Sequence, residues 1–267
     1  MGRLAATLLH QCRLFFIALQ FFTRVPIPAW VGFEAVWLQH ASRYFPLVGV
    51  VVGGVTAIVY AAAAWLWPAP VAVLLSTVAG IWLTGAFHED GFADTCDGFG
   101  GGTTAERVML IMKDSRIGTY GAVGIGLMLA VKCVTLALLP PSMVIGALLV
   151  AHPLSRFAAA TLIYTMEYAR AEGKAKPLAQ HMSGAELAIA AACTVLACAA
   201  VACSGVLAWA VIGAATVAAA AAAVWLARIF MRRIGGYTGD CLGAVQQLSE
   251  VAIYLCVLAA AGHRAWP

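Results

Sequence analysis

Long apolar runs, separated by polar stretches of unequal length, form the main pattern along this chain. A helix rises about 1.5 Å per residue, so about 20 apolar residues cross the roughly 30 Å hydrocarbon core of a bilayer. Backbone polar groups in lipid must hydrogen-bond within the protein, and such runs are therefore expected to be helices. We predict spans over Phe45–Trp67, Val71–Phe87, Thr119–Leu139, Ser142–Tyr164, Ala185–Cys203, Val206–Ala227 and Gly243–Gly262.

The N-terminal run, Leu4–Phe22, is less uniform because it carries Arg13 and several polar residues. It is predicted either to span the bilayer or to lie in its interface as an amphipathic helix. No small-residue cleavage site follows it, so we interpret it as a retained helix rather than a signal peptide. The predicted fold class is all-α. It is a polytopic membrane helix bundle of about seven transmembrane helices plus this N-terminal helix, in a single membrane-embedded domain over residues 1–267.

Composition supports a membrane protein: 63% of the residues are hydrophobic and 10% are charged, against about 25% charged in soluble domains. Long polar connections alternate with short ones, so the long connections are expected on one face of the bundle. They hold 11 of the 16 basic residues: Arg24, Arg43, Arg107, Lys113, Arg116, Arg170, Lys174, Lys176, Arg228, Arg232 and Arg233. By the positive-inside rule that face is cytoplasmic. No basic stripe interleaved with aromatic residues occurs, so a nucleic-acid partner is not expected.

An acidic cluster begins where one predicted span ends, in the stretch GAFHEDGFADTCDGFGGG. If the chain remains helical there, Asp90, Asp94 and Asp97 follow one another at i, i+4 and i+7 and share a stripe of the helix. Like charges at this spacing repel, and a bound divalent cation would remove the repulsion. Carboxylate oxygens suit Mg²⁺ or Mn²⁺. The alternative is a plain acidic cap, and the nearby glycines also allow a loop.

Two further polar segments are expected on the same face. Lys113 and Arg116 lie about a helical turn apart and are suited to binding phosphate oxygens, although they also fit an ordinary basic anchor for the next span. Thr238, Gly239 and Asp240 precede the last span, where they predict an anion cradle or a further metal ligand; a simple helix cap by Asp240 is the alternative. Glu250, inside that span, is predicted to point at the same site.

These features fit two classes of protein. One is a Mg²⁺-dependent enzyme that transfers a phosphoryl-linked group, and the other is a transporter whose acids bind the cation it moves. Transporter acids are expected near the bilayer midplane or on broken helices, whereas most of the acids here lie at the predicted cytoplasmic ends of helices. The enzyme is therefore favoured.

Several motifs together resemble the cobalamin synthase family, whose members are adenosylcobinamide-GDP ribazoletransferases. The motifs are FTRVPIP (22–28), YFPLVG (44–49), HEDGFADTCDG (88–98), MKDSRIGTYG (112–121) and TGDCLGA (238–244). They occur in order along the chain, and the element H-x-D-G-x-A-D-x-x-D-G is the specific one. The site is also similar to that of CDP-alcohol phosphotransferases, but Asp94-Thr95 stands where the D-G-x-x-A-R element of that family has Ala-Arg. A lipid enzyme of that kind is therefore the second choice.

The resemblance implies a bacterial inner-membrane enzyme that joins adenosylcobinamide-GDP to α-ribazole, or to its 5′-phosphate, and releases GMP. It implies Asp90, Asp94 and Asp97 as Mg²⁺ ligands and Lys113 and Arg116 as diphosphate contacts. Asp240 is expected to complete the metal shell or to accept the proton of the attacking hydroxyl. His88, Thr238, Gly239 and Glu250 are expected to contact substrate. Expected partners are these substrates and the lipid bilayer, and a homo-oligomer or an association with other enzymes of the pathway is left open.

Overall fold

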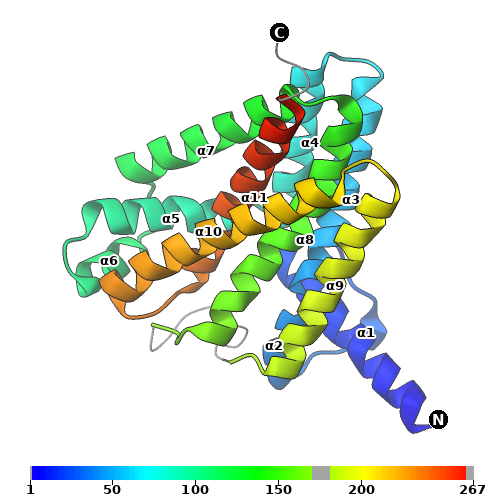
Figure 1. Ribbon diagram of the computed structural model, residues 1–267. Coiled ribbons are helices and arrows are strands. Elements are labelled where there is room, and N and C mark those ends of the chain that lie inside the picture. Colours follow the sequence, from blue (N-terminus) through cyan, green and yellow to red (C-terminus); the bar gives the residue numbers. More distant parts are fainter. Residues whose placement is uncertain (1, 170–180, 263–267) are drawn as a thin grey trace.

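The structure is a computed structural model that describes residues 2–169 and 181–262, and helices make up nearly all of them (Figure 1). Two 3₁₀ turns, Ala29–Val31 and Ser42–Tyr44, connect helices near the N-terminus. The helices are α1 (Arg3–Phe22), α2 (Ala35–Ala41), α3 (Phe45–Ala64), α4 (Ala69–Thr84), α5 (Phe87–Gly101), α6 (Ala105–Ile111), α7 (Thr119–Ala137), α8 (Pro141–Thr165), α9 (Gly184–Cys203), α10 (Trp209–Ile234) and α11 (Gly239–Gly262).

Among the described residues, 7 segments are long and apolar enough to cross a bilayer, or up to 8 with one bent pair of helices. The predicted all-α membrane bundle is confirmed. The N-terminal run is helical, and Ala5–Phe22 meets the length and composition expected of a span. Helix α8 lies at the centre of the bundle with 78% of its most apolar window buried, and α11 follows with 67%. Glycines bring helices close there: a Cβ on Gly53 of α3 would lie 2.9 Å from the Leu148 carbonyl oxygen of α8.

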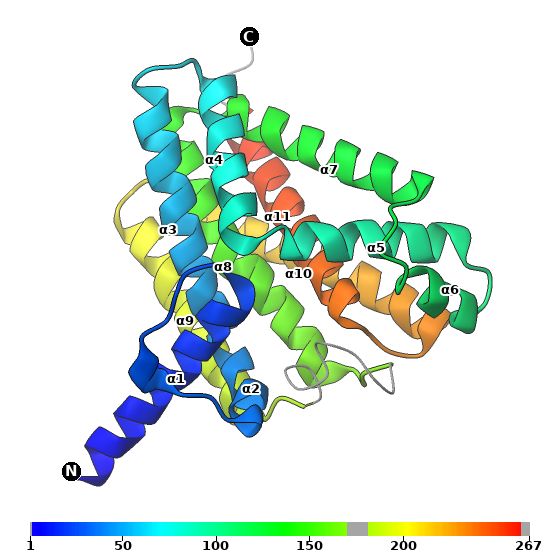
Figure 2. The ribbon, with the colours of Figure 1, turned by 180° about the vertical axis from the view of Figure 1, so that it is seen from behind.

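One predicted span, Val71–Phe87, is wrong at its end. Helix α4 stops at Thr84, and α5 then starts at Phe87 at an angle of 89° to α4, as the view from behind shows (Figure 2). Gly85 and Ala86 both have positive φ, 65° and 59°, so the chain leaves the helix there. The apolar run crosses this break without a polar residue, and hydropathy therefore gave no sign of it.

Helix α10 also differs from the predicted span, Val206–Ala227. It continues to Ile234, so that Arg228, Arg232 and Arg233 lie in its last turns and not in a loop. Arginine is a good helix former, and Gly235, with φ of 71°, supplies the left-handed residue that ends the helix. This extension carries Arg233 to the end of α5.

Candidate active site

The acidic cluster lies on α5, a helix of its own that runs roughly across the bundle (Figure 2). The helical prediction for Asp90, Asp94 and Asp97 is confirmed, in spite of the glycines between them. Their surroundings differ, however, because Asp90 is exposed, Asp94 is half-buried and Asp97 is buried. The three carboxylates are therefore not equivalent.

Asp97 holds the start of α7. Its two carboxylate oxygens accept hydrogen bonds from the backbone N–H groups of Gly118 and Gly121, each at 2.7 Å. A carboxylate in this position satisfies N–H groups that have no partner inside the helix, and its charge favours the helix N-terminus. A Cβ on either glycine would clash with the Asp97 carboxylate. Asp97 thus has a structural role that spacing alone did not predict.

The C-terminal end of α5 is held by a side chain of α10. Arg233 donates hydrogen bonds to the carbonyl oxygens of Phe99 at 3.3 Å and Gly102 at 2.5 Å. A guanidinium at the carbonyl end of a helix satisfies unpaired acceptors and complements the helix dipole. With Asp97 holding α7, these bonds fix the direction of α5 relative to both neighbours.

The start of α11 is formed by the glycine-rich segment TGDCLG. Thr238 is the N-cap: its hydroxyl oxygen accepts a hydrogen bond from the Cys241 N–H at 3.3 Å. The alternative that Asp240 caps this helix is therefore wrong. Thr238 is fully buried, so the cap occupies the hydroxyl that was predicted to contact substrate. The segment is held in place by backbone bonds between Tyr237 and the chain just after α8.

Helices α5 and α11 touch through glycines. A Cβ built on Gly91 would lie 3.0 Å from the Asp240 Cα, and one on Gly243 would lie 3.1 Å from the His88 carbonyl oxygen. Any other residue at these positions would have to push the facing helix away by a few tenths of an ångström. The predicted proximity of Asp240 to the acidic cluster is thereby confirmed at the level of the backbone, since Gly91 lies between Asp90 and Asp94 on α5.

Across the described residues, the structure assembles no group of three or more His, Cys, Asp or Glu side chains that could hold a metal ion. The carboxylates on α5 and at the start of α11 nevertheless suit Mg²⁺, which commonly binds one or two carboxylates and completes its shell with water and substrate phosphate. Asp90, which is exposed, is better placed for this than Asp97, whose oxygens bind backbone N–H groups. Magnesium binding by these residues stays a prediction.

Lys113 and Arg116 are exposed side chains of the segment that connects α6 to α7. The Met112 side chain packs this segment against Gly98 of α5, so closely that a Cβ on Gly98 would contact it. Arg116 forms an ion pair with Asp114, Nη2 to Oδ2 at 2.6 Å. Hydrogen bonds from Arg116 lower the pKa of Asp114 to about 2. The predicted diphosphate contacts are therefore solvent-accessible and lie on the same side of the molecule as Asp97.

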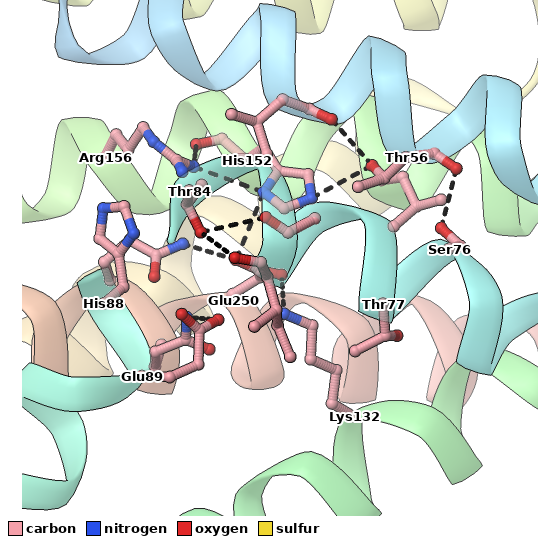
Figure 3. Close-up of a pocket in the computed structure, with 16 residues that line it drawn as sticks. Thr56, Ser76, Thr77, Thr84, His88, Glu89, Lys132, His152, Arg156 and Glu250 are labelled. Atoms are coloured by element: carbon pink, nitrogen blue, oxygen red, sulfur yellow. Dashed lines mark hydrogen bonds and ion pairs between the residues drawn. The ribbon is translucent and has the colours of Figure 1, made fainter. Parts of the chain in front are cut away.

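Glu250 lies elsewhere than predicted. It is fully buried in a polar pocket between α4, α7, α8 and α11 (Figure 3). Its carboxylate forms an ion pair with Lys132 at 2.5 Å and accepts hydrogen bonds from Gln246 at 2.5 Å and Tyr254 at 2.9 Å. An ionised group in a membrane interior needs such partners. The sequence showed Lys132 and Glu250 as polar residues inside spans, but not that they pair.

His88 and Glu89 begin α5 and face inward, between the acidic cluster and this polar pocket (Figure 3). His88 is buried and stacks on Phe22, with ring centroids 5.4 Å apart. Glu89 accepts a hydrogen bond from the Gln247 side chain at 2.8 Å. His88 is therefore packed inside the bundle, whereas Glu89 joins α5 to α11.

Comparison with known proteins gives a consistent result over most of the chain. The sequence model of the family described as cobalamin-5-phosphate synthase matches residues 14–258. A protein of Leptothrix cholodnii named adenosylcobinamide-GDP ribazoletransferase is 50% identical over 259 residues, which cover 95% of this chain and 98% of the relative.

Other relatives carry the same name. The protein of Shewanella frigidimarina is 46% identical over 256 residues, covering 94% of this chain and 96% of its own length. That of Shewanella oneidensis is 48% identical over 258 residues, covering 93% and 95%. No solved structure matches the chain significantly.

Proposed function

The chain belongs to the cobalamin-5-phosphate synthase family, and from that premise we propose that it joins adenosylcobinamide-GDP to α-ribazole, or to α-ribazole 5′-phosphate, and releases GMP. It is a multi-pass membrane protein and a transferase of the late nucleotide-loop assembly of vitamin B12. The observation that carries the location of the active site is the contact between Gly91 and Asp240, which brings the α5 acids to the start of α11.

The reaction forms one bond to phosphorus and breaks another. A ribose hydroxyl of α-ribazole attacks the phosphorus nearest to cobinamide, and the bond from that phosphorus to the GMP oxygen breaks. Negative charge grows on the phosphoryl oxygens and on the departing GMP. In the proposed site Asp240 accepts the proton of the attacking hydroxyl, while Lys113 and Arg116 bind the diphosphate.

Arg116 has to give up part of its interaction with Asp114 to bind the diphosphate. That exchange is feasible because both side chains are solvent-exposed, where an ion pair is worth only about 0–1 kcal/mol. A diphosphate offers the guanidinium several oxygens in place of one carboxylate. Asp114 then remains as a neighbour that keeps the guanidinium oriented in the free enzyme.

Asp90 and Asp94 are the residues proposed to hold Mg²⁺. When bound, this ion would neutralise diphosphate charge and stabilise the leaving group. The face of the bundle that carries these residues is proposed to face the cytoplasm across a bacterial inner membrane, because the segments predicted on that face hold 11 of the 16 basic residues of the chain. A lipid phosphotransferase or a cation transporter is not favoured, since the relatives named above are ribazoletransferases.

The test is a reconstitution. The purified chain in vesicles, given adenosylcobinamide-GDP, α-ribazole and Mg²⁺, is expected to produce adenosylcobalamin and GMP in equal amounts by chromatography. Chelation of the metal should stop the reaction, and returning Mg²⁺ should restore it. Corrinoid-independent movement of cations into sealed vesicles, without GMP release, would contradict the proposal and favour a transporter.

A further inference from the structure

An aromatic pocket lies beside the proposed site, and the proposed reaction does not use its phenylalanine side chains. Its wall is made of four phenylalanines from three helices: Phe21 and Phe22 at the end of α1, Phe45 at the start of α3 and Phe87 at the start of α5. The rings pack edge to face, with centroids 4.5 Å apart for Phe22 and Phe45 and 5.2 Å apart for Phe21 and Phe87. The space among them that water-sized molecules can occupy is about 30 Å³.

The floor of this pocket is polar. His88, Arg156 and Gln246 line it, and the last two residues are each 2% exposed. Within the described part of the chain, Arg156 Nε and Gln246 Oε1 have no hydrogen-bond partner. A buried donor or acceptor left unpaired is costly. Arg156 and Gln246 also line the buried polar pocket around Glu250, so the two pockets share these residues. An aromatic wall beside an unpaired donor and acceptor suits a small polar-edged aromatic ligand.

The pocket is lined by sequence neighbours of the residues that carry the proposed chemistry. Gly239 and Gly243 of α11 line it, and Asp240 follows Gly239 directly. On the other side, His88 of α5 precedes Asp90 by two residues. A ligand with its ring among the phenylalanines would therefore extend its remaining atoms toward the space between α5 and the start of α11.

We propose that this pocket binds the benzimidazole base of α-ribazole. The inference rests on the proposed function, which supplies the substrate. A benzimidazole is flat and apolar, and its unsubstituted ring nitrogen is an acceptor suited to the Arg156 Nε–H group. Gln246 Oε1 accepts a hydrogen bond from a ribose hydroxyl. The polar edge of guanine suits an aromatic wall less well, and a lipid chain would leave both polar atoms unpaired.

The first test uses the two least enclosed phenylalanines. In Phe21→Ala and Phe87→Ala, the KM for α-ribazole should rise about tenfold, because each substitution removes an aromatic contact worth about 1.4 kcal/mol. The KM for adenosylcobinamide-GDP should stay unchanged. Phe157→Ala is the matched control, since Phe157 lines a separate apolar pocket against α10.

The second test needs no variant and no turnover. Calorimetry on the detergent-solubilised chain should detect binding of benzimidazole and at least tenfold weaker binding of indole, which has the same shape but lacks the acceptor nitrogen. Addition of α-ribazole should displace benzimidazole. Equal affinities of the two probes, or no binding of either, would overturn the assignment of Arg156 and of the pocket.

The outcomes separate the two proposals. If the wild-type chain forms adenosylcobalamin but Phe21→Ala and Phe87→Ala change both KM values equally or neither, the pocket proposal is wrong and the proposed function stands. If no product forms while benzimidazole binds in competition with α-ribazole, the pocket stands and the proposed reaction is wrong. A tightly held lipid that α-ribazole does not displace would also overturn the pocket proposal.

Discussion

Asp97 shows how one residue of a like-charged group takes a different role from its neighbours. Its carboxylate is buried against the first turn of α7, where it receives the N–H groups of Gly118 and Gly121 at 2.7 Å. Asp90, by contrast, is exposed on the same helix. Asp97 therefore has a structural role, whereas Asp90 is open to solvent.

This separation predicts different effects on stability. Asp97→Ala leaves two N–H groups without an acceptor, so it should lower the free energy of unfolding by about 1–3 kcal/mol. Asp97→Asn keeps one acceptor oxygen and should lose less. Asp90→Asn, at an exposed position, should unfold at the wild-type temperature. Thermal unfolding in detergent measures all three, and equal stability of Asp97→Ala and Asp90→Asn would contradict the assigned roles.

At this scale the sequence indicates which residues belong to the site better than it indicates which partners they contact. The spacing of Asp90, Asp94 and Asp97 correctly indicated one helix, but the partners of Asp97 lie 21 and 24 residues further along the chain. Thr238 was expected to contact substrate from the family resemblance, and in the structure it caps α11. Which role a side chain takes depends on the packing of a second helix, and one sequence does not contain that packing explicitly.

Two elements, α5 and the start of α11, determine the geometry of the site. The bend at Gly85 and Ala86 turns α5 away from α4, and the glycine contacts with α11 then fix its position. Most helices were predicted from apolar runs, because length and hydropathy are the physical requirements for crossing a bilayer. The bend was not predicted, since it depends on backbone conformation at two small apolar residues.

The glycine contact predicts that a single methyl group will disturb the site. In Gly91→Ala the added Cβ would lie 3.0 Å from the Asp240 Cα and should push α11 away from α5. Relieving this contact needs a shift of a few tenths of an ångström. Because a displacement of about 1 Å at a catalytic group commonly costs about 100-fold in rate, we expect kcat to fall by about threefold to tenfold.

The matched control is Gly126→Ala, in the interior of α7, where nothing lies within 4 Å of an added Cβ. Alanine favours helix over glycine by about 0.5–1 kcal/mol, so this variant should keep wild-type turnover and be at least as stable. Steady-state kinetics of both variants provide the measurement. Full activity of Gly91→Ala would show that the two helices do not need this approach.

Buried polar side chains around Glu250 connect helices at the centre of the molecule. Lys132 of α7 and Glu250 of α11 pair at 2.5 Å, and His152 of α8 lies 3.5 Å from the same carboxylate (Figure 3). Three helices thus meet at one buried carboxylate. Glu250 was predicted as a substrate contact, and the pairing with Lys132 instead indicates a structural role within the membrane.

Removing one partner of this pair should be costly. Lys132→Met leaves Glu250 buried without its ammonium partner, so it should lower the free energy of unfolding by about 3–5 kcal/mol, and Glu250→Gln should do likewise. The double variant should recover part of the loss, because no unpaired charge remains. Unfolding of the four proteins in detergent forms the double-mutant cycle, and additive losses would show that the two residues are not coupled.

The central claim is that the acids of α5 and Asp240 of α11 form one phosphoryl-transfer site. The most direct measurement is the turnover of Asp94→Asn, Asp240→Asn and the double variant in vesicles with saturating Mg²⁺. The account predicts at least about a 100-fold loss of kcat in each single variant, and a double variant within about tenfold of the worse one, because residues that act as a unit are not additive. Losses that multiply in the double variant, or near-normal turnover of either single variant, would contradict a shared site.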